Sequence, residues 1–79
     1  MNLAARSLTT TGLTQRALAH ALGVSLGALN RWANGRAVPP PAVVVLLQEA
    51  AEGAPSAAWA ARLDEGRRMY PDGRGRHGR

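Results

Sequence analysis

Residues 14–32 read TQRALAHALGVSLGALNRW, and they contain two short helical patterns separated by a glycine. Thr14 can cap a helix in which apolar residues recur at the spacing of one helical face, at Leu18, Ala19 and Leu22. Gly23 then permits a sharp turn, because a residue without a Cβ readily adopts the left-handed conformation. The stretch therefore predicts two short helices joined by a glycine turn. The second helix starts after a cap at Ser25 and turns Leu29 and Trp32 inward.

Three further segments have helical patterns. Residues 2–11 form a weak candidate that Gly12 would end, and residues 42–52 follow three prolines, of which Pro41 suits the first helical position. The run of valines and leucines in 42–52 also fits a buried strand, but a lone strand would have no sheet to join. A last helix is expected from a cap at Ser56 to about Tyr70. The sequence thus predicts an all-α protein, a small bundle of about five helices.

The chain divides into three parts on this pattern. Residues 1–53 hold the first four helices, and residues 54–70 hold the last one. The last helix either packs on the core or forms a dimer seam. The arginine- and glycine-rich residues 71–79 are expected to be a disordered basic tail.

Composition excludes several classes of protein. The 79 residues contain no cysteine and two isolated histidines, so neither a disulfide framework nor a metal site is expected. No apolar stretch approaches the roughly 20 residues that span a bilayer, and the N-terminus does not resemble a signal peptide. We also find no nucleophile with a partner base and no glycine-rich phosphate loop. We expect a soluble, cytoplasmic protein that is not an enzyme and needs no cofactor.

The net charge of +5 is unevenly distributed along the chain. Residues 1–48 contain Arg6, Arg16, Arg31 and Arg36 and no acid, whereas all five acidic residues follow them. A genome rich in arginine codons would explain the choice of arginine over lysine, but it would not explain the missing acids. The cationic half therefore favours a polyanionic partner.

The same half contains a set of residues in register with a known motif: Gly12 to Gln15, Leu18, Ala19, Leu22 to Ser25, Leu29, Arg31, Trp32, Asn34 to Arg36 and Pro39. With these residues, roughly residues 3–53 resemble the helix-turn-helix of the Cro/cI/Xre family of phage and bacterial regulators. The resemblance implies a phage or mobile-element origin, as for the anti-CRISPR-associated repressors, which are similarly small.

The resemblance implies that the helix after Gly23 enters the major groove of DNA. The residues that would then face the bases are Ser25, Leu26, Gly27, Asn30 and Arg31. Arg31 suits guanine O6 and N7, or alternatively a phosphate, and Asn30 suits adenine N6 and N7. Leu26 has two open roles, contact with a thymine methyl group and ordinary packing. Gly27 departs from the family, which usually has a polar or β-branched residue there.

Contacts with the DNA backbone are expected from a second set of residues. Gln15 starts a helix, where free N–H groups favour an anion, and family members commonly use this glutamine on the backbone. The remaining expected contacts are Arg16, Asn34 and Arg36.

Apolar residues left over in the last two helices suggest a twofold dimer, because such small binding modules usually read two half-sites. The expected seam consists of Val44, Val45, Trp59, Leu63 and Tyr70. For the last three, packing on the core is the alternative.

These patterns together predict a sequence-specific regulator that binds double-stranded DNA, a dimeric repressor of an inverted-repeat operator with no small-molecule ligand. An antitoxin that holds a protein toxin with residues 56–79 is the alternative. A second alternative is an RNA-binding protein that uses the basic face and tail.

Overall fold

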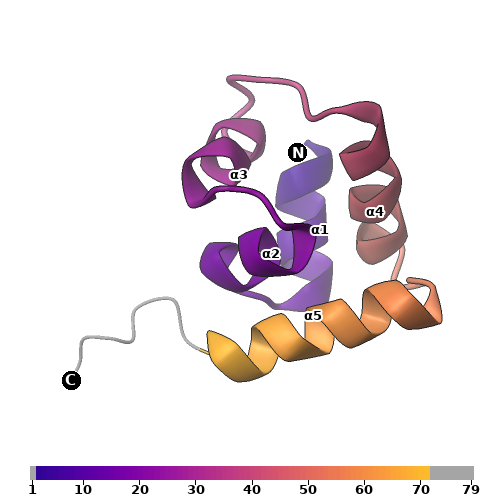
Figure 1. Ribbon diagram of the computed structural model, residues 1–79. Helices are drawn as coiled ribbons and strands as arrows, with labels where there is room; N and C mark the ends of the chain where they lie inside the picture. Colours follow the sequence, from indigo (N-terminus) through magenta and orange to yellow (C-terminus); the bar gives the residue numbers. More distant parts are fainter. Residues whose placement is uncertain (1, 72–79) are drawn as a thin grey trace.

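The computed structural model describes residues 2–71, which form five α-helices and no strand (Figure 1). They are α1 (Leu3–Thr11), α2 (Gln15–Leu22), α3 (Leu26–Ala33), α4 (Pro41–Ala51) and α5 (Ala57–Met69). The predicted all-α bundle is therefore confirmed. The predicted tail lies outside the described residues, apart from Pro71.

Side-chain caps set the helix boundaries where the sequence placed them. The hydroxyl oxygens of Thr14, Ser25 and Ser56 each accept a hydrogen bond from the backbone N–H three residues later, at 3.0, 3.0 and 3.2 Å. Gly23 ends α2 with a φ of 76°, which a residue with a Cβ would adopt only with strain. α4 starts with Pro41 in its first turn and has no side-chain cap.

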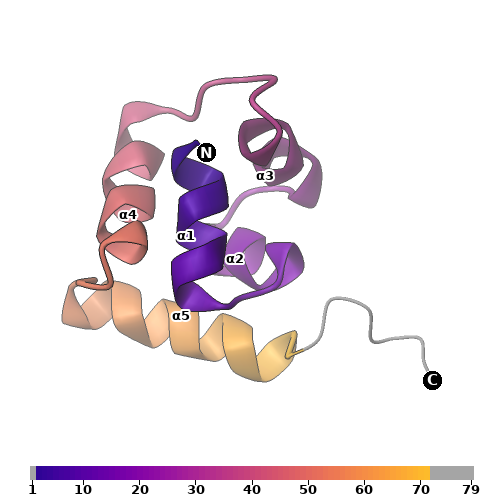
Figure 2. The same cartoon turned by 180° about the vertical axis from the view of Figure 1, so that it is seen from behind.

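The helix α2 lies between α3 and α5, and its alanines fit this position (Figures 1 and 2). Leu18 and Ala19 are buried as predicted, and Leu22 is half-buried. Ala17 and Ala21 are buried as well, although the sequence pattern did not assign them to the core. Their burial follows from α5, which covers a second side of α2.

The helix α1 packs against α4 (Figure 2). Leu47 and Ala50 of α4 are buried, and Val43 and Leu46 pack against the same core. The Thr10 hydroxyl also donates to the carbonyl oxygen of Ala51 at 2.9 Å. The apolar run that fitted both a strand and a helix is thus a helix. None of the helices in residues 2–71 is long and apolar enough to cross a membrane.

The aromatic stripe of α5 packs into the core of the single chain. Trp59 is 2% exposed and Leu63 is 6% exposed, and the Trp59 indole N–H donates to the Leu46 carbonyl oxygen at 2.9 Å. The assignment of these two residues to a dimer seam is therefore wrong. A side chain already removed from solvent within one chain has no surface to offer a second copy.

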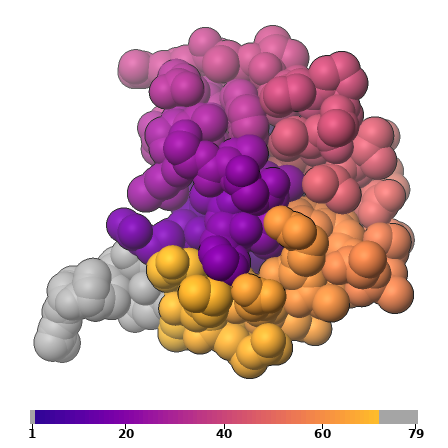
Figure 3. All heavy atoms as spheres, viewed as in Figure 1, coloured from indigo at the N-terminus to yellow at the C-terminus, as the bar shows by residue number. Residues whose placement is uncertain are grey.

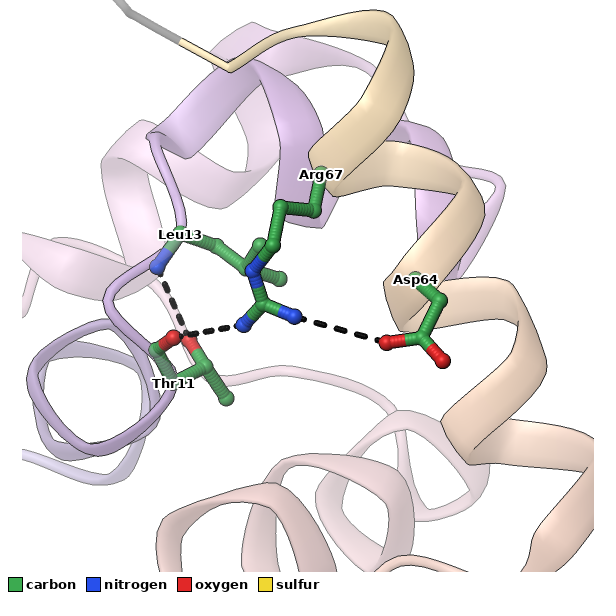
Figure 4. Close-up of polar contacts among 4 residues, drawn as sticks. All are labelled: Thr11, Leu13, Asp64 and Arg67. Atoms are coloured by element: carbon green, nitrogen blue, oxygen red, sulfur yellow. Dashed lines mark hydrogen bonds and ion pairs between the residues drawn. The ribbon is translucent and has the colours of Figure 1, made fainter.

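Two arginines of α5 fasten it to the other helices. Arg62 Nε donates to the Ala21 carbonyl oxygen at 2.7 Å. Arg67 donates from one guanidinium nitrogen to the Thr11 carbonyl oxygen at 2.8 Å and from the other to Asp64 at 3.4 Å (Figure 4). Thr11 ends α1, so Arg67 binds one of the carbonyl groups that a helix end leaves without a helical partner. The helix α5 is thus an integral part of the bundle.

The backbones of α2 and α5 lie close together at Gly66. A Cβ at this position would lie 2.5 Å from the Ala17 carbonyl oxygen, which is a backbone atom and cannot rotate away. We expect Gly66→Ala to lower the free energy of unfolding by about 1–3 kcal/mol, because the two helices must separate to admit the methyl group. Urea denaturation followed by circular dichroism measures the change.

Gly27→Ala is the matched control for this substitution. It makes the same change in another helix, at a position where the nearest atom to an added Cβ is 3.7 Å away. Without a steric clash, alanine stabilises a helix by up to about 1 kcal/mol relative to glycine. If Gly66→Ala raised stability as Gly27→Ala does, the close crossing of α2 and α5 would be incorrect.

Candidate nucleic-acid interface

The outer face of α3 consists of the residues predicted to contact bases. Leu29 and Trp32 are buried and fix the helix to the core. The five residues predicted to contact bases are all exposed to solvent, namely Ser25, Leu26, Gly27, Asn30 and Arg31. Those within the helix lie on one face, because residues four apart are neighbours on a helix surface.

A chain of amide side chains connects α3 to the start of α2. Asn30 Nδ2 donates to Gln15 Oε1 at 3.2 Å, and Asn34 Nδ2 donates to Asn30 Oδ1 at 3.1 Å. The structure thus brings together one predicted base contact and two predicted backbone contacts. The Asn30 amide keeps one N–H and one oxygen lone pair for a ligand, since a primary amide has two donors and two lone pairs.

The side chain of Arg31 extends along α3 toward its N-terminus. One of its guanidinium nitrogens would lie 3.7 Å from a Cβ added at Gly27, one turn earlier. This direction is typical of helical side chains, which tilt toward the start of the helix. The charge of Arg31 is therefore held over the first turn of α3.

Arg16 lies at the other end of the predicted surface, beside α5. Its guanidinium carbon is 6.0 Å from the centre of the Tyr70 ring, within the range of a cation–π contact. Tyr70 also lies against the His20 ring, with the two ring centres 5.7 Å apart. Tyr70 is half-buried by these contacts between α2 and the end of α5.

His20 has a contact that the sequence did not indicate. Its Nε2 lies 3.1 Å from Oε2 of Glu65 on α5, and this hydrogen bond is the main reason that the pKa of the exposed Glu65 carboxyl is lowered. The two residues are far apart in sequence, and no local pattern connects them. The pair joins α2 to α5 and lies outside the predicted base-contacting face.

The arginines in the acid-free half of the chain are not paired with acids in the described residues. Arg6, Arg16, Arg31 and Arg36 are exposed, and within residues 2–71 none of them is in an ion pair. The acidic residues within residues 2–71 belong to α4, to the C-terminal cap of α4 and to α5. In Figure 3 the atoms of α3 lie at the upper left of the surface, those of α4 at the upper right, and those of α5 along the lower edge. The absence of acids from residues 2–48 favours an anionic ligand on this half of the chain.

Two short helices with a glycine turn, the second anchored by buried residues and exposed along a cationic face, define a helix-turn-helix protein. A family model described as helix-turn-helix matches residues 11–52, more than half of the chain. The chain therefore belongs to the Cro/C1-type helix-turn-helix family of DNA-binding transcriptional regulators, as its sequence predicted. No match was found among curated proteins or solved structures.

Proposed function

We propose that this protein is a sequence-specific regulator that binds double-stranded DNA as a dimer and represses transcription from an inverted-repeat operator. The observation that carries the proposal is the exposed face of α3, which Leu29 and Trp32 fix to the core in the half of the chain that has no acid. Such a rigid, cationic helix fits the width of the major groove. Binding across a promoter excludes polymerase by occupancy alone.

The polar residues of the interface divide into two roles. We expect Arg31, whose guanidinium lies over the first turn of α3, to donate two hydrogen bonds to guanine O6 and N7. Asn30 reads adenine with the donor and the acceptor that its contacts with Gln15 and Asn34 leave over. Gln15 at the start of α2, with Arg16, Asn34 and Arg36 around the same surface, contacts phosphates and sets the register on the duplex.

The dimer seam in this proposal lies on α4. Val45 is 54% exposed and its neighbour Val44 is half-buried, so the two leave apolar surface for a second copy. We expect the wild-type protein to sediment as a dimer and Val45→Glu to sediment as a folded monomer that binds an inverted repeat at least about 10-fold more weakly, because a buried, unpaired carboxylate is costly.

Val38→Ala is the control, since Val38 is an exposed valine in the loop before α4. This variant should remain dimeric. Sedimentation equilibrium distinguishes the outcomes. A Val45→Glu variant that remains dimeric, or a wild-type protein that is monomeric at the concentrations that saturate DNA, would contradict a seam on α4.

Competition between a duplex DNA and a structured RNA at one fixed salt concentration tests the choice of nucleic acid. Affinity for either polymer depends on the phosphates contacted and on salt, so the comparison is valid only at equal ionic strength. A DNA-reading α3 predicts that the duplex displaces the RNA, because the deep, narrow major groove of an RNA helix does not admit side chains. Preferential binding of the RNA would overturn the proposed function.

A further inference from the structure

The first turn of α3 contains a pair of residues that the fold does not explain. Leu26 is 39% exposed, although it is a large apolar side chain on a helix that otherwise buries its leucine and tryptophan. Next to it, Gly27 lies in the helix with an ordinary right-handed backbone. Glycine in a helix lowers stability relative to alanine, so its presence needs a reason.

Packing within the chain does not supply that reason. A Cβ at Gly27 would meet only the flexible end of Arg31, at the ordinary contact distance of 3.7 Å. Gly66 shows the contrast, because a Cβ there would clash with backbone. The missing side chain at position 27 therefore leaves space on the outside of the protein, on the face that the proposed function turns toward DNA.

The helix surface formed by Leu26 and Gly27 is apolar. Neither Leu26 nor Gly27 has a side-chain donor or acceptor, so the side chains of this pair cannot read the hydrogen-bonding pattern of a base edge. The C5 methyl group of thymine is the apolar group that the bases present in the major groove. Arg31 borders this apolar surface, since its guanidinium lies beside the space above Gly27.

We propose that Leu26 and Gly27 form a thymine-methyl reader, an inference that rests on the proposed binding of α3 in the major groove. The backbone at Gly27 approaches the base edges closely, and this approach brings the Leu26 side chain onto the methyl group. Arg31 reads a guanine in the same half-site. The operator half-site then contains a thymine recognised by its methyl group beside a guanine recognised by hydrogen bonds.

Replacing thymines by deoxyuridine in the half-site tests the reader, because this change removes only the methyl group. The probe is the duplex sequence enriched from a random pool by the wild-type protein. We expect deoxyuridine at one position of each half-site to weaken binding by about 3- to 10-fold, the effect of exposing one buried methyl group. Leu26→Ala should bind both duplexes equally, whereas the control Met69→Ala, exposed on α5, should keep the wild-type difference.

Gly27→Ala tests the close approach separately. Its thermal unfolding midpoint should rise by up to about 5 °C, which shows that the helix is intact. Its affinity for the selected duplex should nevertheless fall by about 10-fold or more, because the added methyl group keeps α3 away from the bases.

Two results would contradict the proposed recognition of a thymine methyl group by Leu26 and Gly27 without contradicting the proposed function. One is equal affinity of the wild-type protein for the thymine and deoxyuridine duplexes at every position. The other is a Gly27→Ala variant that binds as tightly as wild type. Failure of the proposed function gives a different result, because the random pool would then yield no enriched duplex. The thymine-methyl recognition would be contradicted as well in that case.

Discussion

Replacement of Trp59 by alanine is expected to lower the free energy of unfolding by about 3–5 kcal/mol. The side chain is 2% exposed, and truncation would leave a cavity where α5 meets α2 and α4. It would also leave the Leu46 carbonyl oxygen without the indole donor that it accepts from at 2.9 Å. Small domains are stable by only about 5–15 kcal/mol, so this one change removes a large share of the total.

Urea denaturation measures the effect of Trp59→Ala, with Met69→Ala as the control on the same helix. Met69 is exposed, so its truncation should change stability by no more than about 0.5 kcal/mol. A dimer-seam role for Trp59 makes the opposite prediction, a stable and folded monomer. That outcome would contradict the packing of α5 described above.

Arg31→Ala is expected to weaken binding to the preferred operator by about 1–3 kcal/mol, or roughly 5- to 150-fold. The loss should relax selectivity at one base pair of each half-site and leave binding to unrelated duplexes less affected. The physical reason is that the paired donors of the guanidinium match guanine O6 and N7, which no other base edge offers together. Fluorescence anisotropy with the operator and its three single-base variants at that position measures the change in selectivity.

Arg36→Ala is the matched control, since it removes an exposed arginine of equal charge from the loop after α3. Its expected effect is uniform across sequences, together with a shallower dependence of affinity on salt, as for the loss of one phosphate contact. If Arg31→Ala and Arg36→Ala behaved alike, Arg31 would be a phosphate contact, and specificity would reside elsewhere on α3.

The helix-turn-helix was predictable because local features define it. Thr14 and Ser25 start its helices through hydrogen bonds within one turn, and Gly23 ends the first through its own backbone freedom. Both kinds of signal are read from a few neighbouring residues. The same holds for Leu29, whose burial follows from its spacing along a short amphipathic helix.

The position of α5 was not predictable in the same way. A stripe such as Trp59 and Leu63 has the same helical spacing whether it packs on its own chain or on a second copy. The deciding feature is the contact of Gly66 with Ala17, which depends on how two helices cross. For the same reason, the burial of Ala17 and Ala21 on a second side of α2 has no sequence signal.

The predicted interface residues are exposed on α3, but the sequence did not reveal their mutual contacts. Asn30 was expected to face bases, and the structure joins it to Gln15 and Asn34. Hydrogen bonds between side chains on different helices depend on tertiary geometry. His20 on α2 is joined to Glu65 on α5 by a contact of the same kind.

The packing of α5 on the core also limits the experiments that can examine an antitoxin role. Deletion of residues 56–79 would remove Trp59 and Leu63 from the core. Such a truncation would unfold the protein, so loss of toxin neutralisation would not identify a toxin-binding segment. Substitutions at exposed positions of α5, such as Met69, avoid this difficulty.

Selection of bound duplexes from a random pool examines directly whether α3 reads specific DNA sequence. We expect enrichment of an inverted repeat whose half-sites lie about one helical turn apart, each with a guanine at which Arg31→Ala loses its preference. Failure to enrich any sequence over random duplex, or an enriched sequence that Arg31→Ala, Gly27→Ala and Leu26→Ala all select unchanged, would contradict sequence-specific reading by α3.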